Sequence, residues 1–137
     1  MKFMFMTLVL TSLSAFGHGE NKPGPHKGHI RMPGPFHTEL VLESSVVKIY
    51  LLDMNFKNPT TLNSKVVLLL KEKTDEILCV DKESYFECPL PGQSTNYLGI
   101  NVKAIRNGVV GKVVYYPLPL TFSKPVATSD DHSHHNH

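Results

Sequence analysis

Several features that would point to a familiar class of protein are missing from this sequence. It has no tryptophan, which argues against an extended polysaccharide-binding platform, and no apolar run reaches the roughly 20 residues that cross a bilayer. A Gly-x-Ser-x-Gly elbow, a phosphate-binding loop, a His-Glu-x-x-His helix and a Cys-x-x-Cys pair are all absent. The formal net charge is only +2 and the basic residues are scattered, so no nucleic-acid-binding face is indicated. The sequence gives no reason to propose an enzyme.

The first residues have the pattern of a secretory signal peptide. Lys2 precedes an apolar run from Phe3 to Leu13, and the small residues Ala15 and Gly17 follow it. This pattern predicts cleavage after Gly17, so that residues 1–17 are the signal peptide and a mature chain of about 120 residues remains. A chain of that length forms one domain. We expect it to be periplasmic or secreted, without stable membrane insertion after cleavage.

The mature chain divides into three regions. Residues 18–35 are rich in Gly, Pro and His, and four prolines with four glycines exclude a helix or a central strand there, so we expect an extended lead-in. Residues 36–122 carry the folded domain. Residues 123–137 form a polar, His-rich tail without periodicity, which we expect to be disordered.

Short strands dominate the middle region, and no amphipathic helix is visible. The expected strands are Phe36–Glu43, Val46–Asp53, Lys65–Lys71, Glu76–Val80, Tyr85–Cys88, Tyr97–Ile105 and Val109–Tyr116. Asn107-Gly108 between the last two is a strong hairpin signal. About seven short antiparallel strands predict an all-β, immunoglobulin-like β-sandwich, with an open barrel as the main alternative.

A hairpin about Ser44-Ser45 would pair the first two strands. That register places Leu40 opposite Ile49 on an apolar face. The other face then carries His37, Glu39, Val41, Lys48, Tyr50 and Leu52. In the same way, a turn at Glu83-Ser84 places Cys79 opposite Cys88, close enough for a disulfide, which fits an exported protein. Two free thiols or a thiolate metal pair remain as alternatives.

All eight histidines lie outside the later strands, in two groups. They are His18, His26, His29 and His37, then His132, His134, His135 and His137. Imidazole is a common ligand of copper and zinc, and His-rich tracts are typical of metal binding. The tail histidines would bind metal weakly and without a fold.

The first group provides the candidate ligands. Cleavage after Gly17 would make His18 the first residue, whose free amine and ring nitrogen, with a third nitrogen from a strand histidine, favour Cu(II). His37 begins a strand, with Glu39 on the same face as a second ligand or as an acceptor that supports the ring. The spacing of His26 and His29 allows both rings to turn toward one ion. A chance terminal histidine, solvated loop histidines and a surface histidine are the alternative interpretations.

Three segments together resemble a known family. They are Lys22 to His29, Phe36 to Val41 and Ile49 to Asp53, and the stretch that contains them, residues 22–53, is about a quarter of the chain. They are similar to small periplasmic domains associated with heavy-metal efflux, which show Gly-Pro-His-Gly-Gly, then His-x-Glu-Leu-Val, then Leu-x-Asp. The resemblance implies a β-sandwich and a metal-handling role for His26, His37 and Glu39. Lys27 stands where that pattern has its first glycine.

A metal-binding protein is the leading interpretation, with copper as the first and zinc as the second candidate cofactor. Its metal ligands would be drawn from His18, His26, His29, His37 and Glu39. It would act as a buffer or carrier linked to metal efflux, with the metal ion and a heavy-metal efflux adaptor as its partners. The alternative is a non-catalytic secreted immunoglobulin-like interaction module whose histidines are incidental. A copper-dependent oxidase built on His18 is the third interpretation.

Overall fold

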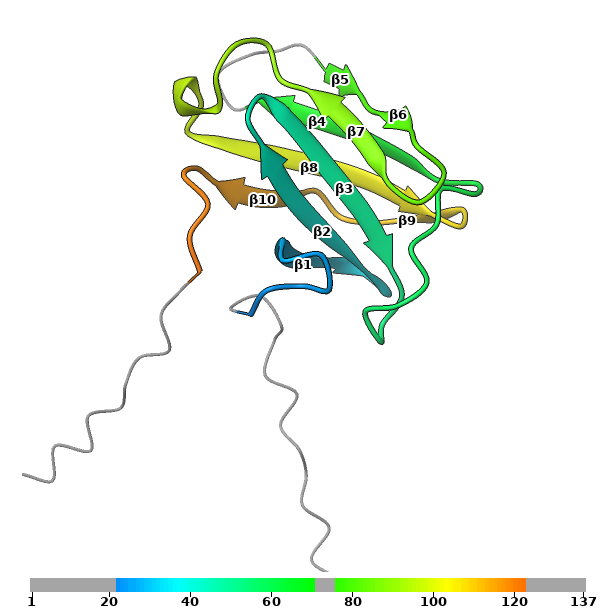
Figure 1. The fold of residues 1–137 in the computed structure, drawn as a ribbon. Coiled ribbons are helices and arrows are strands. Elements are labelled where there is room, and N and C mark those ends of the chain that lie inside the picture. The colour runs from blue at the N-terminus through cyan, green and yellow to red at the C-terminus, as the bar shows by residue number, and fades with distance from the viewer. Residues whose placement is uncertain (1–21, 71–75, 123–137) are drawn as a thin grey trace, which may run out of the picture.

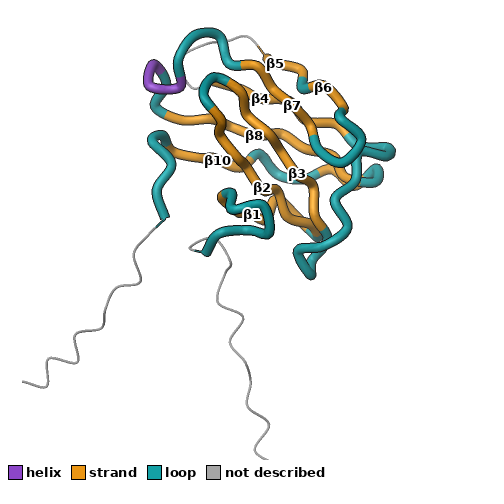
Figure 2. The backbone as a smooth tube through the Cα atoms, viewed as in Figure 1, coloured by secondary structure: helices purple, strands orange, loops and turns teal. Residues whose placement is uncertain are grey.

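Two antiparallel sheets face each other in the computed structural model, which describes residues 22–70 and 76–122 (Figure 1). One sheet has the order β1-β2-β3-β7-β6, and the other has the order β10-β8-β4-β5 with β9 beside β8. The strands are β1 His29–Gly34, β2 Phe36–Glu43, β3 Val46–Leu52, β4 Lys65–Leu70, β5 Glu76–Leu78, β6 Val80–Asp81, β7 Phe86–Pro89, β8 Gly99–Arg106, β9 Val109–Val110 and β10 Val114–Pro117. Among the described residues the one helical element is the 3-10 turn Ser94–Asn96, drawn in purple in Figure 2. The predicted all-β sandwich is confirmed.

Alternating side chains of both sheets meet in one core. Leu40 and Ile49 are directly opposite each other in the β2–β3 register, as the Ser44-Ser45 hairpin predicts, and both are fully buried. Leu68 and Val102 are a matching pair from β4 and β8 in the other sheet. Burial of each such side chain stabilises the fold by about 1.5–3 kcal/mol. The packing therefore leaves the alternate residues of β2 and β3 on the outer face of the first sheet.

The core also contains one buried polar pair. Tyr116 from β10 is fully buried, and its hydroxyl lies 2.6 Å from the hydroxyl of Thr38 and 3.1 Å from the backbone oxygen of the same residue. A buried hydroxyl without a hydrogen-bond partner would destabilise the fold, and Thr38 provides this partner for the hydroxyl of Tyr116. The contact joins β10 of one sheet to β2 of the other.

Strand β1 is the main difference from the expected extended lead-in. Its residues pair with β2 from His29 opposite Leu40 to Gly34 opposite Phe36, with an irregularity after Arg31. β1 lies at the edge of its sheet. An edge strand tolerates a proline such as Pro33, because one side of its backbone has no neighbouring strand to which an N–H would donate. The prolines thus exclude a central strand but leave an edge strand open.

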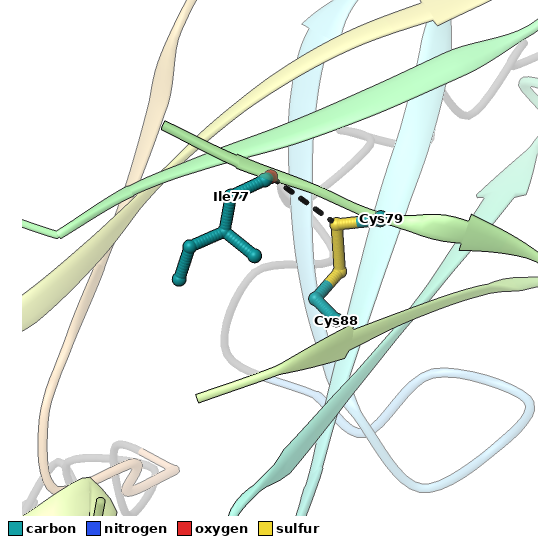
Figure 3. The surroundings of a disulfide bond; sticks show 3 residues. All are labelled: Ile77, Cys79 and Cys88. Atoms are coloured by element: carbon teal, nitrogen blue, oxygen red, sulfur yellow. Dashed lines mark hydrogen bonds between the residues drawn. A yellow bond between two sulfur atoms is a disulfide. The ribbon is translucent and has the colours of Figure 1, made fainter. Parts of the chain in front are cut away.

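The disulfide between Cys79 and Cys88 is confirmed (Figure 3). The two Cα atoms are 4.4 Å apart, and the register of β6 with β7 is the one that a turn at Glu83-Ser84 gives. The backbone N–H of Cys79 donates to Val66 in the second sheet, while Cys88 belongs to β7 in the first. The bond therefore joins the two sheets where the chain passes from one to the other. The carbonyl oxygen of Ile77 lies 3.9 Å from Sγ of Cys79, a close contact only, because an oxidised sulfur has no hydrogen to donate.

Two sequence predictions fall outside the described ranges, namely the signal peptide at residues 1–17 and the His-rich tail at residues 123–137. Within residues 22–70 and 76–122, no helix has the length and apolar character needed to span a membrane.

Candidate functional site

Glu39 is a fully buried carboxylate on the outer face of the first sheet. In β2 it alternates with Thr38 and Leu40, which point into the core, so its side chain points away from the second sheet. The lead-in covers it, because residues 24–28 form a closed turn in which the N–H of Gly24 donates to the carbonyl of Gly28 and the N–H of Lys27 donates to the carbonyl of Gly24, both at 2.9 Å. The lead-in therefore covers the side chain of Glu39.

Three donors from this turn bind the carboxylate of Glu39. The backbone N–H groups of His26 and Gly28 donate to Oε2 at 2.8 and 2.9 Å. The ring Nδ1 of His26 lies 2.7 Å from Oε1. Burial of a carboxylate is costly unless hydrogen bonds satisfy it, and these charge-assisted hydrogen bonds supply what water would have supplied. They also attach the lead-in to β2.

The turn fits over Glu39 because it has glycines at two contacts. A Cβ on Gly24 would overlap Oε2 of Glu39, and a Cβ on Gly28 would lie 2.6 Å from the carbonyl oxygen of Leu40. Lys27 between them has a φ of 62°, in the left-handed region that favours glycine. Lys27 thus adopts, with a side chain, a backbone conformation that glycine adopts without steric cost.

His26 is held with one ring nitrogen turned away from Glu39. An ionised carboxylate only accepts, so Nδ1 carries a proton, and Nε2 is the nitrogen that bears the lone pair in the neutral ring. The ring is stacked on Tyr50, with centroids 3.6 Å apart and planes 8° from parallel. Tyr50 is the residue of β3 directly opposite Glu39. Burial raises the pKa of the Tyr50 hydroxyl, so the ring that supports His26 stays neutral.

His37 has a similar arrangement two residues before Glu39. Its Nδ1 lies 3.0 Å from the carbonyl oxygen of Asp53, which only accepts, so Nδ1 carries a proton and Nε2 is again the nitrogen that bears the lone pair in the neutral ring. The ring is stacked on Phe56 at 4.1 Å. The carboxylate of Asp53 organises the turn that carries Phe56, and a hydrogen bond from the backbone of Lys57 is the main reason that the pKa of Asp53 is lowered.

His29 lies on the other side of the sheet. It is opposite Leu40 in the β1–β2 register, and directly opposite residues of an antiparallel pair project to the same face, here the core side. Its ring is stacked on Phe122 at 3.9 Å, and its Nε2 is buried without a hydrogen-bond partner. Burial lowers the pKa of His29. A hydrogen bond to the backbone of Thr121 raises the pKa and offsets only part of this effect.

The described residues bring together only part of the predicted ligand set. His26 contacts Glu39, and His37 lies on the same face, whereas His29 points to the opposite face, so the rings of His26 and His29 do not turn toward one ion. His18 lies outside the described residues. Within residues 22–70 and 76–122, no group of three or more His, Cys, Asp or Glu side chains is arranged to hold a metal ion.

Sequence reasoning paired Glu39 with His37, while the structure pairs it with His26. It also missed Tyr50 as the support of the His26 ring, although the predicted hairpin register already places Tyr50 opposite Glu39. Nothing in the local pattern indicates that Gly24 lies over Glu39, since the two residues are fifteen positions apart.

The chain was compared with models of protein families, with curated proteins and with solved structures, and none of them matches it.

Proposed function

We propose that this protein is an exported metal-binding protein that binds copper first and zinc second, and that it acts as a buffer or carrier linked to heavy-metal efflux. The observation that carries the proposal is the orientation of His26, whose Nδ1 is held by the buried carboxylate of Glu39. Histidines that bind metals commonly donate their other ring N–H to a carboxylate or a backbone carbonyl. His37 has the second of these partners, the carbonyl of Asp53.

The residues present fit a nitrogen-ligated metal. Both imidazoles lie on the outer face of the first sheet, each with Nδ1 held by an acceptor, so that Nε2 is the nitrogen available to a metal in the neutral ring. Neutral imidazole nitrogen suits copper and zinc, and a bound metal would supply Lewis acidity or, for copper, a redox centre. Glu39 acts as the acceptor that orients His26 rather than as a ligand, because its two oxygens are already engaged. His29 is left out of this set because its ring lies on the other face.

His18 is the proposed source of further nitrogen ligands. The first described residue is Lys22, and the four residues back to His18 span at most about 14 Å. His26 lies four residues beyond Lys22, so this reach allows His18 and His26 to bind one ion together. If cleavage follows Gly17, His18 brings both its amine and its ring, and tetragonal nitrogen ligation favours Cu(II).

The exported location rests on two observations. The disulfide between Cys79 and Cys88 is typical of oxidising compartments such as the periplasm. The sequence pattern of residues 1–17 is that of a signal peptide. The link to efflux comes from the family resemblance of the segments that carry His26, His37 and Glu39.

Titration of the mature protein with Cu(II) and Zn(II) tests the function. A form that lacks residues 129–137 removes the tail histidines, and we expect it to retain one Cu(II) site. His26→Ala and His37→Ala should each weaken that site, whereas His29→Phe is the matched control and should leave the affinity unchanged. An extra residue before His18 displaces the free amine and should lower the affinity if the amine is a ligand.

Loss of all Cu(II) and Zn(II) binding on removal of residues 129–137 would contradict the proposal. The non-catalytic interaction module would then be the better interpretation. Equal affinity of the wild type and the double variant His26→Ala/His37→Ala would place the metal elsewhere in the chain.

A further inference from the structure

Methionine occurs at only two positions after the predicted signal peptide, Met32 and Met54. Both side chains are about half exposed, at 46% and 48%. A single exposed apolar residue is ordinary on a protein surface. These two differ from the other exposed apolar residues because a thioether is a soft metal ligand, and because each belongs to an element that contacts or pairs beside His37.

Met32 faces outward from β1. Arg31 before it reaches the core side, where its guanidinium lies 4.8 Å from the ring centroid of the buried Tyr116. Pro33 after it also lies on the core side, because a Cβ on Gly111, in the segment before β10, would lie 2.7 Å from a carbon of Pro33. Successive side chains of a strand alternate between the faces, so Met32 lies on the outer face of the first sheet.

His37 is the residue of β2 that faces this part of β1. On β2 the regular pairing with β1 stops at Thr38 and resumes at Phe36, and His37 is the residue between them. Met32 lies in the matching gap of β1. Cross-strand neighbours on one face have Cβ atoms about 4.5–5.5 Å apart, and a methionine sulfur lies two bonds beyond its Cβ. The sulfur of Met32 therefore reaches the ring of His37.

Met54 belongs to the turn that holds His37, which Figure 1 shows at the end of β3, beside the start of β2. The carbonyl of Asp53, bonded to the nitrogen of Met54, lies 3.0 Å from Nδ1 of His37 and accepts from the N–H of Phe56 at 3.1 Å. Phe56 stacks on the ring and has a φ of 60°, a strained conformation for a bulky side chain. The Asp53 carboxylate holds this turn by accepting from the N–H of Lys57. The fold thus fixes the backbone of Met54 one peptide bond from the partner of His37.

Nε2 of His37 is accessible from outside. Within residues 22–70 and 76–122, the only buried side-chain nitrogen or oxygen without a hydrogen-bond partner is Nε2 of His29. Nε2 of His37 has no partner either, so its absence from that class means that solvent reaches it. An accessible imidazole nitrogen with two thioethers around it makes a set of uncharged, soft ligands.

We propose that Nε2 of His37 and the sulfurs of Met32 and Met54 form a binding site for Cu(I). Thioether sulfur selects Cu(I), whereas Cu(II) prefers tetragonal nitrogen and oxygen ligation. Methionine has three rotatable bonds, so both sulfurs adjust to the ion while the strand and the turn hold their backbones. The inference rests on the proposed function and deepens it, because it assigns the monovalent ion to one end of the face that carries His26.

Silver tests the site in the mature protein, because Ag(I) has the charge and the ligand preference of Cu(I) and does not change its oxidation state. With carbon-13 in the methionine methyl groups, NMR shows one signal each for Met32 and Met54, and we expect one equivalent of Ag(I) to shift both. Met32→Leu and Met54→Leu nearly conserve side-chain volume. Each should lower the Cu(I) affinity about tenfold, measured against a competing chelator in ascorbate, and leave the Cu(II) affinity at the wild-type value.

Leu78→Met is the matched control, since Leu78 is exposed and pairs with Val67 on the other sheet. This added thioether should leave the Cu(I) affinity unchanged, and its methyl signal should not shift with the first equivalent of Ag(I).

Unshifted signals of Met32 and Met54 would overturn the proposal. Shifts of the same size in His37→Ala would also overturn it, because the imidazole would then not be a ligand. Failure of the proposed function is seen separately. A wild type that binds neither Cu(II) nor Zn(II) but shows both methyl shifts, lost in His37→Ala, supports the Cu(I) site and contradicts only the binding of divalent ions.

Discussion

Replacement of Glu39 by glutamine separates the orientation of His26 from the stability of the fold. Glutamine has the shape of glutamate but only one accepting oxygen. That oxygen can still accept from the backbone N–H groups of His26 and Gly28, which now share Oε2 at 2.8 and 2.9 Å. The side-chain NH2 then faces Nδ1 of His26 and can only donate to it.

This exchange reverses the tautomer of His26. When Nδ1 accepts a hydrogen bond, the proton moves to Nε2, and the nitrogen that faces outward loses its lone pair. We expect the fold to lose only about 1 kcal/mol, because three hydrogen bonds remain although all three become neutral ones. Metal affinity should fall about 10- to 100-fold, the usual cost of removing the partner that orients a ligand histidine.

Two measurements check this prediction together. Nitrogen NMR of the His26 ring reports which nitrogen carries the proton, and Cu(II) competition gives the affinity. Glu39→Ala is the comparison that removes all three hydrogen bonds and should lower stability more than Glu39→Gln does. Unchanged Cu(II) affinity in Glu39→Gln, with the proton shown on Nε2, would refute the reasoning, because His26 would then not be a ligand.

The remaining predictions concern stability. Lys27→Gly should stabilise the protein by about 0.5 kcal/mol in urea unfolding, since it relieves a left-handed φ at some cost in chain entropy, whereas Lys27→Ala keeps the Cβ and should not stabilise it. Replacement of Cys79 and Cys88 by alanine should lower the unfolding free energy by about 2–3 kcal/mol, the value for closing so short a loop, and reduction of the wild type should have a similar effect. Because burial lowers the pKa of His29 from 6.5, the unfolded chain binds the proton more readily, and stability should fall as the pH drops below that value. The difference in thermal stability between the wild type and His29→Phe should therefore change with pH over this range, and a constant difference would contradict it.

The sequence by itself determined the sandwich and its local registers. Side chains of a strand alternate between two faces, so the pattern of β2 and β3 was sufficient to place Leu40 opposite Ile49 and Glu39 on the other face. The same short-range logic placed Cys79 opposite Cys88, because a two-residue turn defines its own register. It did not indicate that the chain changes sheets at Cys79, which depends on contacts with Val66 in a distant strand.

Only the tertiary structure decided which histidine meets Glu39. The lead-in has no periodic pattern, so its path over β2 follows from contacts between residues that are distant along the chain, such as the close approach of Gly24 to Glu39. That path brings His26 to the carboxylate, and the pairing of β1 sends His29 to the opposite face only three residues later. A buried carboxylate needs donors wherever the fold can supply them, and here the donors lie eleven and thirteen residues upstream, beyond the reach of any local pattern.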